Sequence, residues 1–204
     1  MPRVFTMTDG AVDSQRLAEA ATLLRRGGLV AFPTETVYGL GADATNTQAI
    51  ERLNRVKGRP PGKPYSLHLG SVEQFFQLVE EVPALARRLI DRWWPGPLTL
   101  IIPRPDGARV GYRVPDHPLA QAFLSACGVP VAAPSANRSG EPPPSHAAAV
   151  IDALGEAIDG VIDGGPTRLG RESTVVEVQG ARLTIHREGA IASAEIHAAI
   201  PHGH

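Results

Sequence analysis

The sequence has 204 residues, 43% of them hydrophobic and 20% charged, which is typical of a globular domain that can bury a core. The formal net charge of −1 excludes a polycationic chain, so any binding of nucleotide or nucleic acid must come from a local patch. The single cysteine, Cys127, excludes an internal disulfide and a Cys-rich zinc site.

Helical and strand periods alternate from the start of the chain. Apolar residues recur at three- to four-residue spacing over 17–24 and stop at Gly27, which predicts an amphipathic helix with a glycine C-cap. The wholly apolar run 29–32 predicts a strand covered on both faces. A second helix is predicted for residues 50–56, ending before Gly58.

Similar patterns continue to the C-terminal region. They predict, in chain order, a strand at 65–69, a helix capped by Ser71, a helix at 83–94, a strand at 98–103, a helix at 118–127, a strand at 130–136, a helix at 145–154 and a strand at 160–163. Residues 173–178 and 181–188 predict an antiparallel hairpin. We therefore expect a single α/β domain over residues 1–204, with an open, twisted sheet of parallel and antiparallel strands and flanking helices.

Glycine and proline concentrate where the predicted strands end. These loops are 33–43, 58–64, 94–97, 133–144 and 163–174. In sheet proteins of this class ligands collect at strand ends, because the loops there carry polar groups. The polar residues of these loops are the first candidates for a site.

The stretch KGRPPGKP places Lys57, Arg59 and Lys63 on a loop stiffened by Gly and Pro. Three cations held close together suit a polyphosphate, whose oxygens arginine can bind in a bidentate manner. The alternative is an ordinary solvated basic loop, and this segment alone does not decide between the two.

The stretch APSANRSG follows a predicted buried strand, and in it Ser135 and Asn137 alternate with small residues. Their side chains can project together toward one ligand and offer both donors and acceptors. The alternative is a Ser/Asn-rich turn without a ligand.

In PTETVYGLGAD, Thr34, Thr36 and Tyr38 alternate and would share one hydrogen-bonding face if the chain stays extended. Glu35 would then point the opposite way, with a role in packing. Gly39 and Gly41 are expected to permit a tight turn.

Further along, Arg113 at the end of a strand suits a carboxylate, whereas His117 is a candidate helix cap. His68 lies in an apolar stretch and is expected to be an interior histidine satisfied by the backbone. Ser173 precedes a buried strand, and Arg187 leads into a turn.

Metal and nucleophile motifs such as HExxH, GxSxG and CxxC are absent from the sequence, as are GxGxxG and the GxxxxGK[ST] loop. A phosphate site would have to be built by side chains from several loops, and no protein metal site is expected. The sequence contains neither a signal-peptide pattern nor an apolar run of roughly 18 residues, so we expect a cytoplasmic protein that does not enter the membrane.

The ordered series PTETVYGLGADA, KGRPPGKPYSLHL, WWPGPLTLI, YRVPDHP, APSANRSGEPPP and GRESTVVE resembles the YrdC-like family of threonylcarbamoyl-adenylate synthases. The resemblance covers roughly residues 15 to 190, nearly the whole chain. Longer family members carry an additional C-terminal domain, so this chain is similar to the short, single-domain form. The resemblance implies a twisted mixed sheet around a basic, concave ligand site.

It also implies a reaction in which L-threonine, bicarbonate and ATP, accompanied by Mg²⁺, give threonylcarbamoyl-AMP, pyrophosphate and water. Other proteins would then transfer the threonylcarbamoyl group to the adenosine beside the tRNA anticodon, and weak binding of tRNA or RNA by this chain itself is a further candidate interaction.

By the same resemblance, the side chains of Thr36, His68, Arg113 and Ser173 and the backbone of Ala133 would hold threonine. The residues implied for ATP are Arg59, Lys63, Ser135 and Arg187, with Lys57 and Asn137 nearby and backbone from Arg109 and Pro143. The cations Lys57, Arg59 and Lys63 would stabilise the charge that builds on departing pyrophosphate.

Two other readings remain open from the sequence. A relative with the same fold could bind nucleotide or RNA and catalyse a different reaction, because a fold does not determine function. A pure RNA-binding module is less consistent with the net charge of −1 and the 5% aromatic content.

Replacing Lys63 with alanine is expected to lower turnover steeply while the fold survives, since the change removes one cation from the triphosphate. Steady-state turnover and circular dichroism of the Lys63→Ala variant check this. A fully active variant would remove the triphosphate role assigned to the loop.

Overall fold

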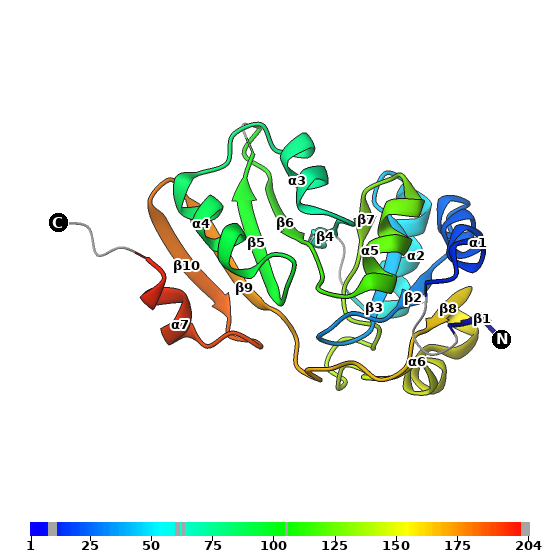
Figure 1. The fold of residues 1–204 in the computed structure, drawn as a ribbon. Coiled ribbons are helices and arrows are strands. Elements are labelled where there is room, and N and C mark those ends of the chain that lie inside the picture. Colours follow the sequence, from blue (N-terminus) through cyan, green and yellow to red (C-terminus); the bar gives the residue numbers. More distant parts are fainter. Residues whose placement is uncertain (8–11, 60–61, 63, 105, 201–204) are drawn as a thin grey trace.

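The computed structural model describes residues 1–7, 12–59, 62, 64–104 and 106–200 (Figure 1). Within these residues the strands are β1 (Arg3–Thr6), β2 (Val30–Phe32), β3 (Gly39–Asp43), β4 (Leu67–His68), β5 (Leu98–Pro103), β6 (Arg109–Arg113), β7 (Val131–Ala132), β8 (Gly160–Asp163), β9 (Thr174–Gln179) and β10 (Arg182–Arg187). The helices are α1 (Ser14–Arg25), α2 (Thr47–Lys57), α3 (Val72–Leu78), α4 (Ala84–Trp93), α5 (Pro118–Cys127), α6 (Ala147–Leu154), a 3₁₀ turn (Gly155–Ala157) and α7 (Ser193–Ala198).

The strands form one ten-stranded sheet in the order β1-β8-β2-β3-β7-β4-β6-β5-β9-β10. The pairs β1/β8, β2/β8, β4/β6 and β5/β9 are parallel, and the other neighbours are antiparallel. The predicted open sheet of mixed strand direction is therefore confirmed.

Helices cover the two halves of the sheet differently (Figure 1). Around β1, β2, β3 and β8, helices α1 and α5 pack in one apolar cluster and α2 and α6 in another, so both faces are buried. Around β5, β6 and β9, one apolar cluster contains α3, α4 and α7. None of the helices in the described residues is long and apolar enough to cross a bilayer.

Local signals in the sequence account for several element ends. Asp13 and Asn46 cap α1 and α2, each accepting a hydrogen bond from a backbone N–H of the first turn. Gly58 ends α2 in the left-handed conformation, with φ of 62°. Ser71 caps α3 as predicted, with its side chain accepting from the Gln74 N–H.

The predicted turn at Gly39 and Gly41 is wrong, because both residues belong to β3. A Cβ on Gly39 would lie 3.2 Å from the Phe32 ring, and one on Gly41 would lie 3.2 Å from side-chain atoms of Leu24 and Val131. The glycines therefore permit close packing on β3 rather than a change of chain direction.

Side chains of β5 alternate between the two faces of the sheet. Leu98, Leu100 and Ile102 join the cluster under α3 and α4, whereas Thr99 points to the opposite face and lines a cavity there. The second half of the sheet thus has an apolar, helix-covered face and a polar face that carries the candidate site.

The apolar side of this half depends on Phe75, which is fully buried and contacts Trp94 and Tyr112 edge to face, with ring centroids 5.0 and 5.4 Å away. Phe75→Ala is expected to lower the free energy of unfolding by about 3–5 kcal/mol, because it leaves a cavity in the core. Denaturant unfolding measures this.

Phe76 is the matched control, since it lies next in the same helix and is 38% exposed. Phe76→Ala should change the free energy of unfolding by less than about 1 kcal/mol. Equal effects of the two variants would contradict the assigned packing.

Candidate functional site

A cavity of about 520 Å³ opens on the polar face of the sheet. Ten of the sequence-predicted site residues line it, namely Lys57, Arg59, His68, Arg113, Ala133, Ser135, Asn137, Pro143, Ser173 and Arg187. They come from positions 57 to 187 of the chain, so the fold brings distant loops to one place.

Strand β4 explains how these segments meet. Its His68 pairs with Val131 of β7 on one side and with Arg113 of β6 on the other. The Ala133 N–H donates to the Ser66 carbonyl at 3.1 Å, which holds the 133–137 segment beside the start of β4.

Lys57 is buried, and its ammonium group is enclosed by the Ser135–Asn137 segment. Nζ donates to the carbonyl of Ser135 at 2.5 Å, to the carbonyl of Asn137 and to Asn137 Oδ1 at 3.3 Å. Burial lowers the pKa of Lys57 to about 8, so the ammonium stays largely protonated at neutral pH. All three N–H donors are occupied.

This arrangement differs from the predicted row of three cations facing one ligand. Lys57 ties the end of α2 to the loop that carries Ser135 and Asn137, and the Ser139 N–H donates back to the Lys57 carbonyl at 2.9 Å. Repulsion between Lys57 and Arg59 is reduced because oxygens surround the positive charge of Lys57.

Arg59 keeps its guanidinium at the cavity. The group lies over the Tyr65 ring, 4.5 Å from its centroid, and Nη2 donates to the Pro64 carbonyl at 3.2 Å. The Tyr65 hydroxyl donates to Asn54 Oδ1 at 2.8 Å, so the ring itself is held by α2. A cation stacked on a fixed ring is available to an anion with a defined orientation.

Asn137 shapes its own loop. Its Nδ2 donates to the carbonyls of Arg138 and Glu141 at 2.9 and 2.6 Å, while its Oδ1 receives the Lys57 ammonium. The amide thus holds residues 137–141 in a tight turn that forms part of the cavity wall.

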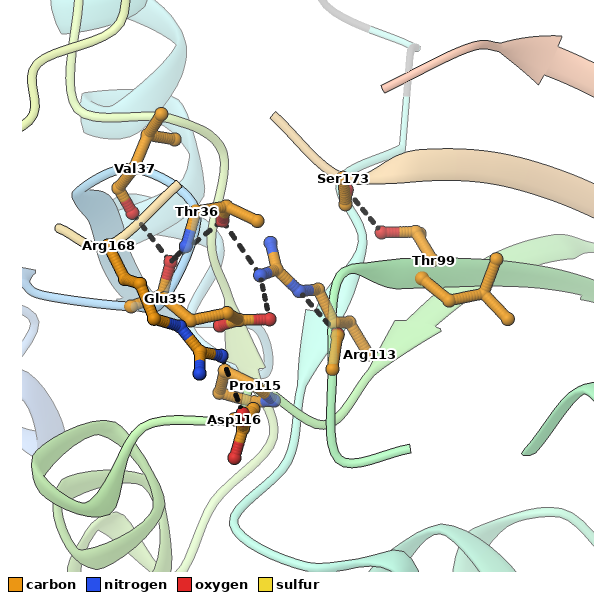
Figure 2. A network of polar contacts seen from close by, with 12 residues as sticks. Glu35, Thr36, Val37, Thr99, Arg113, Pro115, Asp116, Arg168 and Ser173 are labelled. Atoms are coloured by element: carbon orange, nitrogen blue, oxygen red, sulfur yellow. Dashed lines mark hydrogen bonds and ion pairs between the residues drawn. The ribbon is translucent and has the colours of Figure 1, made fainter. Parts of the chain in front are cut away.

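Arg113 is buried and forms an ion pair with Glu35, with Nη2 2.9 Å from Glu35 Oε1 (Figure 2). The same nitrogen donates to Thr36 Oγ1 at 2.7 Å. The loop bends at 35–37, so Glu35 does not point away as expected for an extended chain. Thr34 and Thr36 still meet, with their hydroxyl oxygens 2.8 Å apart.

Ser173 connects two groups of predicted residues. Its hydroxyl lies 2.8 Å from Thr99 Oγ1, and its carbonyl accepts from Arg187 Nε and Nη2 at 3.1 and 3.0 Å. Arg187 also pairs with Glu172 at 2.9 Å. A register shift between Ile185 and Arg187 in β10 turns Arg187 toward the cavity.

His68 is buried between Phe32 and the cavity, as expected for an interior histidine. Burial, assisted by the positive charge of Arg113, lowers its pKa to about 3, so the imidazole is neutral at physiological pH. The expectation that the backbone satisfies this histidine is wrong for Nδ1, which has no hydrogen-bond partner among the described residues. His117 occupies the N-cap position of α5, but its side chain does not form a capping hydrogen bond there.

Two predicted residues are placed differently, and a third is not described. Thr36 is fully buried and contacts Arg113, and it is absent from the cavity lining within the described residues. Arg109 lies at the other end of β6 from Arg113, is exposed, and pairs with Glu177, so the geometry gives no support to a role of its backbone at the cavity. Lys63 lies outside the residues that the structure describes.

Several lining residues were missed from the sequence. Thr99 is the one polar residue in the apolar run LTLIIP, which was an available signal. Tyr65, Glu141 and Glu172 also line the cavity. They lie within the motifs quoted from the sequence, but no pattern of residue spacing singles them out. The described residues contain no group of three or more His, Cys, Asp or Glu side chains able to hold a metal ion.

Comparison with known proteins finds a matching family and several relatives of this chain. The Sua5/yciO/yrdC family profile, described as "Telomere recombination", matches residues 22–189. A threonylcarbamoyl-AMP synthase of Bacillus subtilis is 44% identical over 200 residues, covering 93% of this chain and 58% of that protein. One from Chromohalobacter salexigens is 39% identical over 175 residues, covering 81% of this chain and 94% of that protein.

The structure is similar to that of Pyrococcus abyssi Sua5 complexed with L-threonine, with a TM-score of 0.89 and 38% identity over 98% of this chain and 61% of that one. The chain therefore spans about three fifths of the length of the B. subtilis and P. abyssi proteins.

Replacing Lys57 with methionine should lower the free energy of unfolding by about 2–3 kcal/mol, because oxygens of Ser135 and Asn137 lose their donor. Denaturant unfolding measures the change. Arg55→Met, which removes an exposed cation from the same helix, is the control and should have an effect below about 0.5 kcal/mol. Wild-type stability of Lys57→Met would contradict the role of the ammonium in holding this loop.

Proposed function

Because the chain belongs to the Sua5/YciO/YrdC family, we propose that it is an L-threonylcarbamoyladenylate synthase. It would convert L-threonine, bicarbonate and ATP into threonylcarbamoyl-AMP, pyrophosphate and water. The names of its relatives and the L-threonine complex of the P. abyssi protein support this proposal.

The observation that carries the proposal is the single cavity shared by the two predicted groups of residues. Arg113, His68, Ala133 and Ser173, predicted for threonine, line the same space as Arg59, Ser135, Asn137, Pro143 and Arg187, predicted for ATP. The groups adjoin where Arg187 Nη2 lies 3.3 Å from Ser173 Oγ. An amino acid and a nucleotide bound there would meet without crossing open solvent.

At the amino-acid end, Arg113 would bind the threonine carboxylate, since a guanidinium is a good partner for that group. The neutral imidazole of His68 and the hydroxyl of Ser173 would bind the hydroxyl and amino groups. A neutral histidine is suited to this role, because a charged one would repel a substrate ammonium.

At the nucleotide end, Arg59, Ser135, Asn137, Pro143 and Arg187 would surround ATP, with Lys63 as a further predicted contact. The threonine amine would form an N–C bond with carbon dioxide, losing a proton, or with bicarbonate, whose C–O bond breaks so that water leaves. An oxygen of the resulting carbamate would attack the α-phosphorus, and the bond from this phosphorus to the bridging oxygen breaks to release pyrophosphate. Arg59 and Arg187 would stabilise the negative charge on the departing pyrophosphate. The proposal requires positioning and electrostatics but no protein nucleophile.

Mg²⁺ would enter with ATP as part of the substrate, held by the phosphate oxygens. Glu141 and Glu172 are the carboxylates that line the cavity among the described residues, and one or two such groups are typical of sites that bind magnesium together with a nucleotide. The product would then pass to proteins that transfer the threonylcarbamoyl group to tRNA.

The proposal predicts that purified protein releases pyrophosphate from ATP only when L-threonine and bicarbonate are both present. A coupled pyrophosphate assay, with mass spectrometry of the adenylate, measures this. Arg113→Ala should lower kcat/KM for threonine by roughly 10²-fold, because the carboxylate loses a charge-assisted contact. Pyrophosphate release that is independent of threonine, or absent altogether, would favour a nucleotide-binding relative with another activity.

A further inference from the structure

Glu35 and Arg113 form a buried ion pair behind the cavity wall, and their side chains are only 1% and 5% exposed. Glu35 lies in the loop after β2, whereas Arg113 ends β6, so the pair joins the two halves of the sheet. A buried ion pair contributes little net stability, because desolvation offsets the attraction. Its presence at the cavity therefore requires another explanation.

We propose that Glu35 is a positioning residue that fixes the guanidinium of Arg113 for the carboxylate of the amino-acid substrate. This inference rests on the proposed function. Glu35 would not touch the substrate, and it would act through Arg113 with the help of Thr36.

The donors of Arg113 are divided between the protein and the cavity. Both N–H groups of Nη2 are occupied, one by Glu35 Oε1 and one by Thr36 Oγ1, and Nε lies 3.4 Å from the Gly96 carbonyl. A guanidinium has five N–H donors. Within the described part of the chain no partner is found for Nη1, so its two donors remain for a ligand.

The hydrogen-bond partners of Thr34 and Thr36 also determine where their hydroxyl protons point. The Val37 carbonyl can only accept, so Thr34 Oγ1 donates to it at 2.7 Å. Thr36 must then donate to Thr34 across 2.8 Å and accept from Arg113 (Figure 2). Neither hydroxyl keeps a proton for a substrate carboxylate, which makes Thr36 part of the support of Arg113 rather than a direct contact.

Arg113 is the one partner found for the Glu35 carboxylate among the described residues. The backbone carbonyl of Glu35 accepts a hydrogen bond from the Leu169 N–H at 2.8 Å, which anchors the loop. Its second oxygen, Oε2, is buried and has no partner among the described residues. Leaving an acceptor unpaired is unfavourable, and a role limited to packing would be fulfilled better by an apolar side chain.

The test measures steady-state kinetics of the full chain with Glu35→Gln, which keeps the shape and removes the charge. The threonine KM should rise at least about tenfold, the size of one lost charge-assisted contact, while kcat and the KM for ATP stay within about threefold. The threonine KM changes and kcat does not, because the contact from Arg113 is weakened equally in the bound substrate and in the transition state. A merely structural defect would instead lower the active fraction, and so kcat, without moving the threonine KM.

Glu51→Gln, an exposed carboxylate on α2, is the control and should leave every constant unchanged. If Glu35→Gln does not fold, Thr36→Val removes the second acceptor in the same shape and should raise the threonine KM several-fold. Threonine KM values within twofold of wild type in the folded variants would overturn the inference. Wild-type protein without threonine-dependent pyrophosphate release would instead overturn the proposed function.

Discussion

The pairing of β4 between β7 and β6 is the constraint on which the site depends. This strand has only two residues, yet it connects the helix-covered half of the sheet to the half with a polar face. Its register sets His68 beside Arg113 and brings Ala133 next to Ser66. A shift of one residue would turn His68 to the opposite face of the sheet and away from the cavity.

The cavity also shows how a protein holds several cations close together. Lys57 is enclosed by loop oxygens, Arg113 by Glu35 and Thr36, and Arg187 by Glu172 and the Ser173 carbonyl. Each positive group has oxygen acceptors close by, so mutual repulsion is reduced and the side chains are fixed. Groups fixed in advance need little reorganisation when charge develops on a substrate.

These contacts separate residues proposed to contact a ligand from residues that hold other side chains in place. Arg113, Arg59 and Arg187 line the cavity, whereas Glu35 and Thr36 lie behind it. Lys57 lines the cavity but uses its donors on the Ser135–Asn137 segment. The proposed ligand contacts in this cavity are therefore distinguished by their unused hydrogen-bond donors as well as by their charge.

Much of the fold was accessible from local patterns. The strand at 98–103, the helix at 118–127 and the strand at 160–163 were predicted with the observed bounds, because periodicity and glycine caps are local properties. Strand β3 was not, since its glycines disfavour a strand unless a close neighbour such as Phe32 requires them.

The same division holds for the site. Loop composition, together with the resemblance to the YrdC-like family, identified ten of the residues that line the cavity. The hydrogen-bond partners of those residues were not visible. Glu35 meets Arg113 across 78 positions, and Lys57 meets Ser135 across 78 as well. Such contacts depend on sheet register and chain packing, which residue spacing along the sequence does not contain.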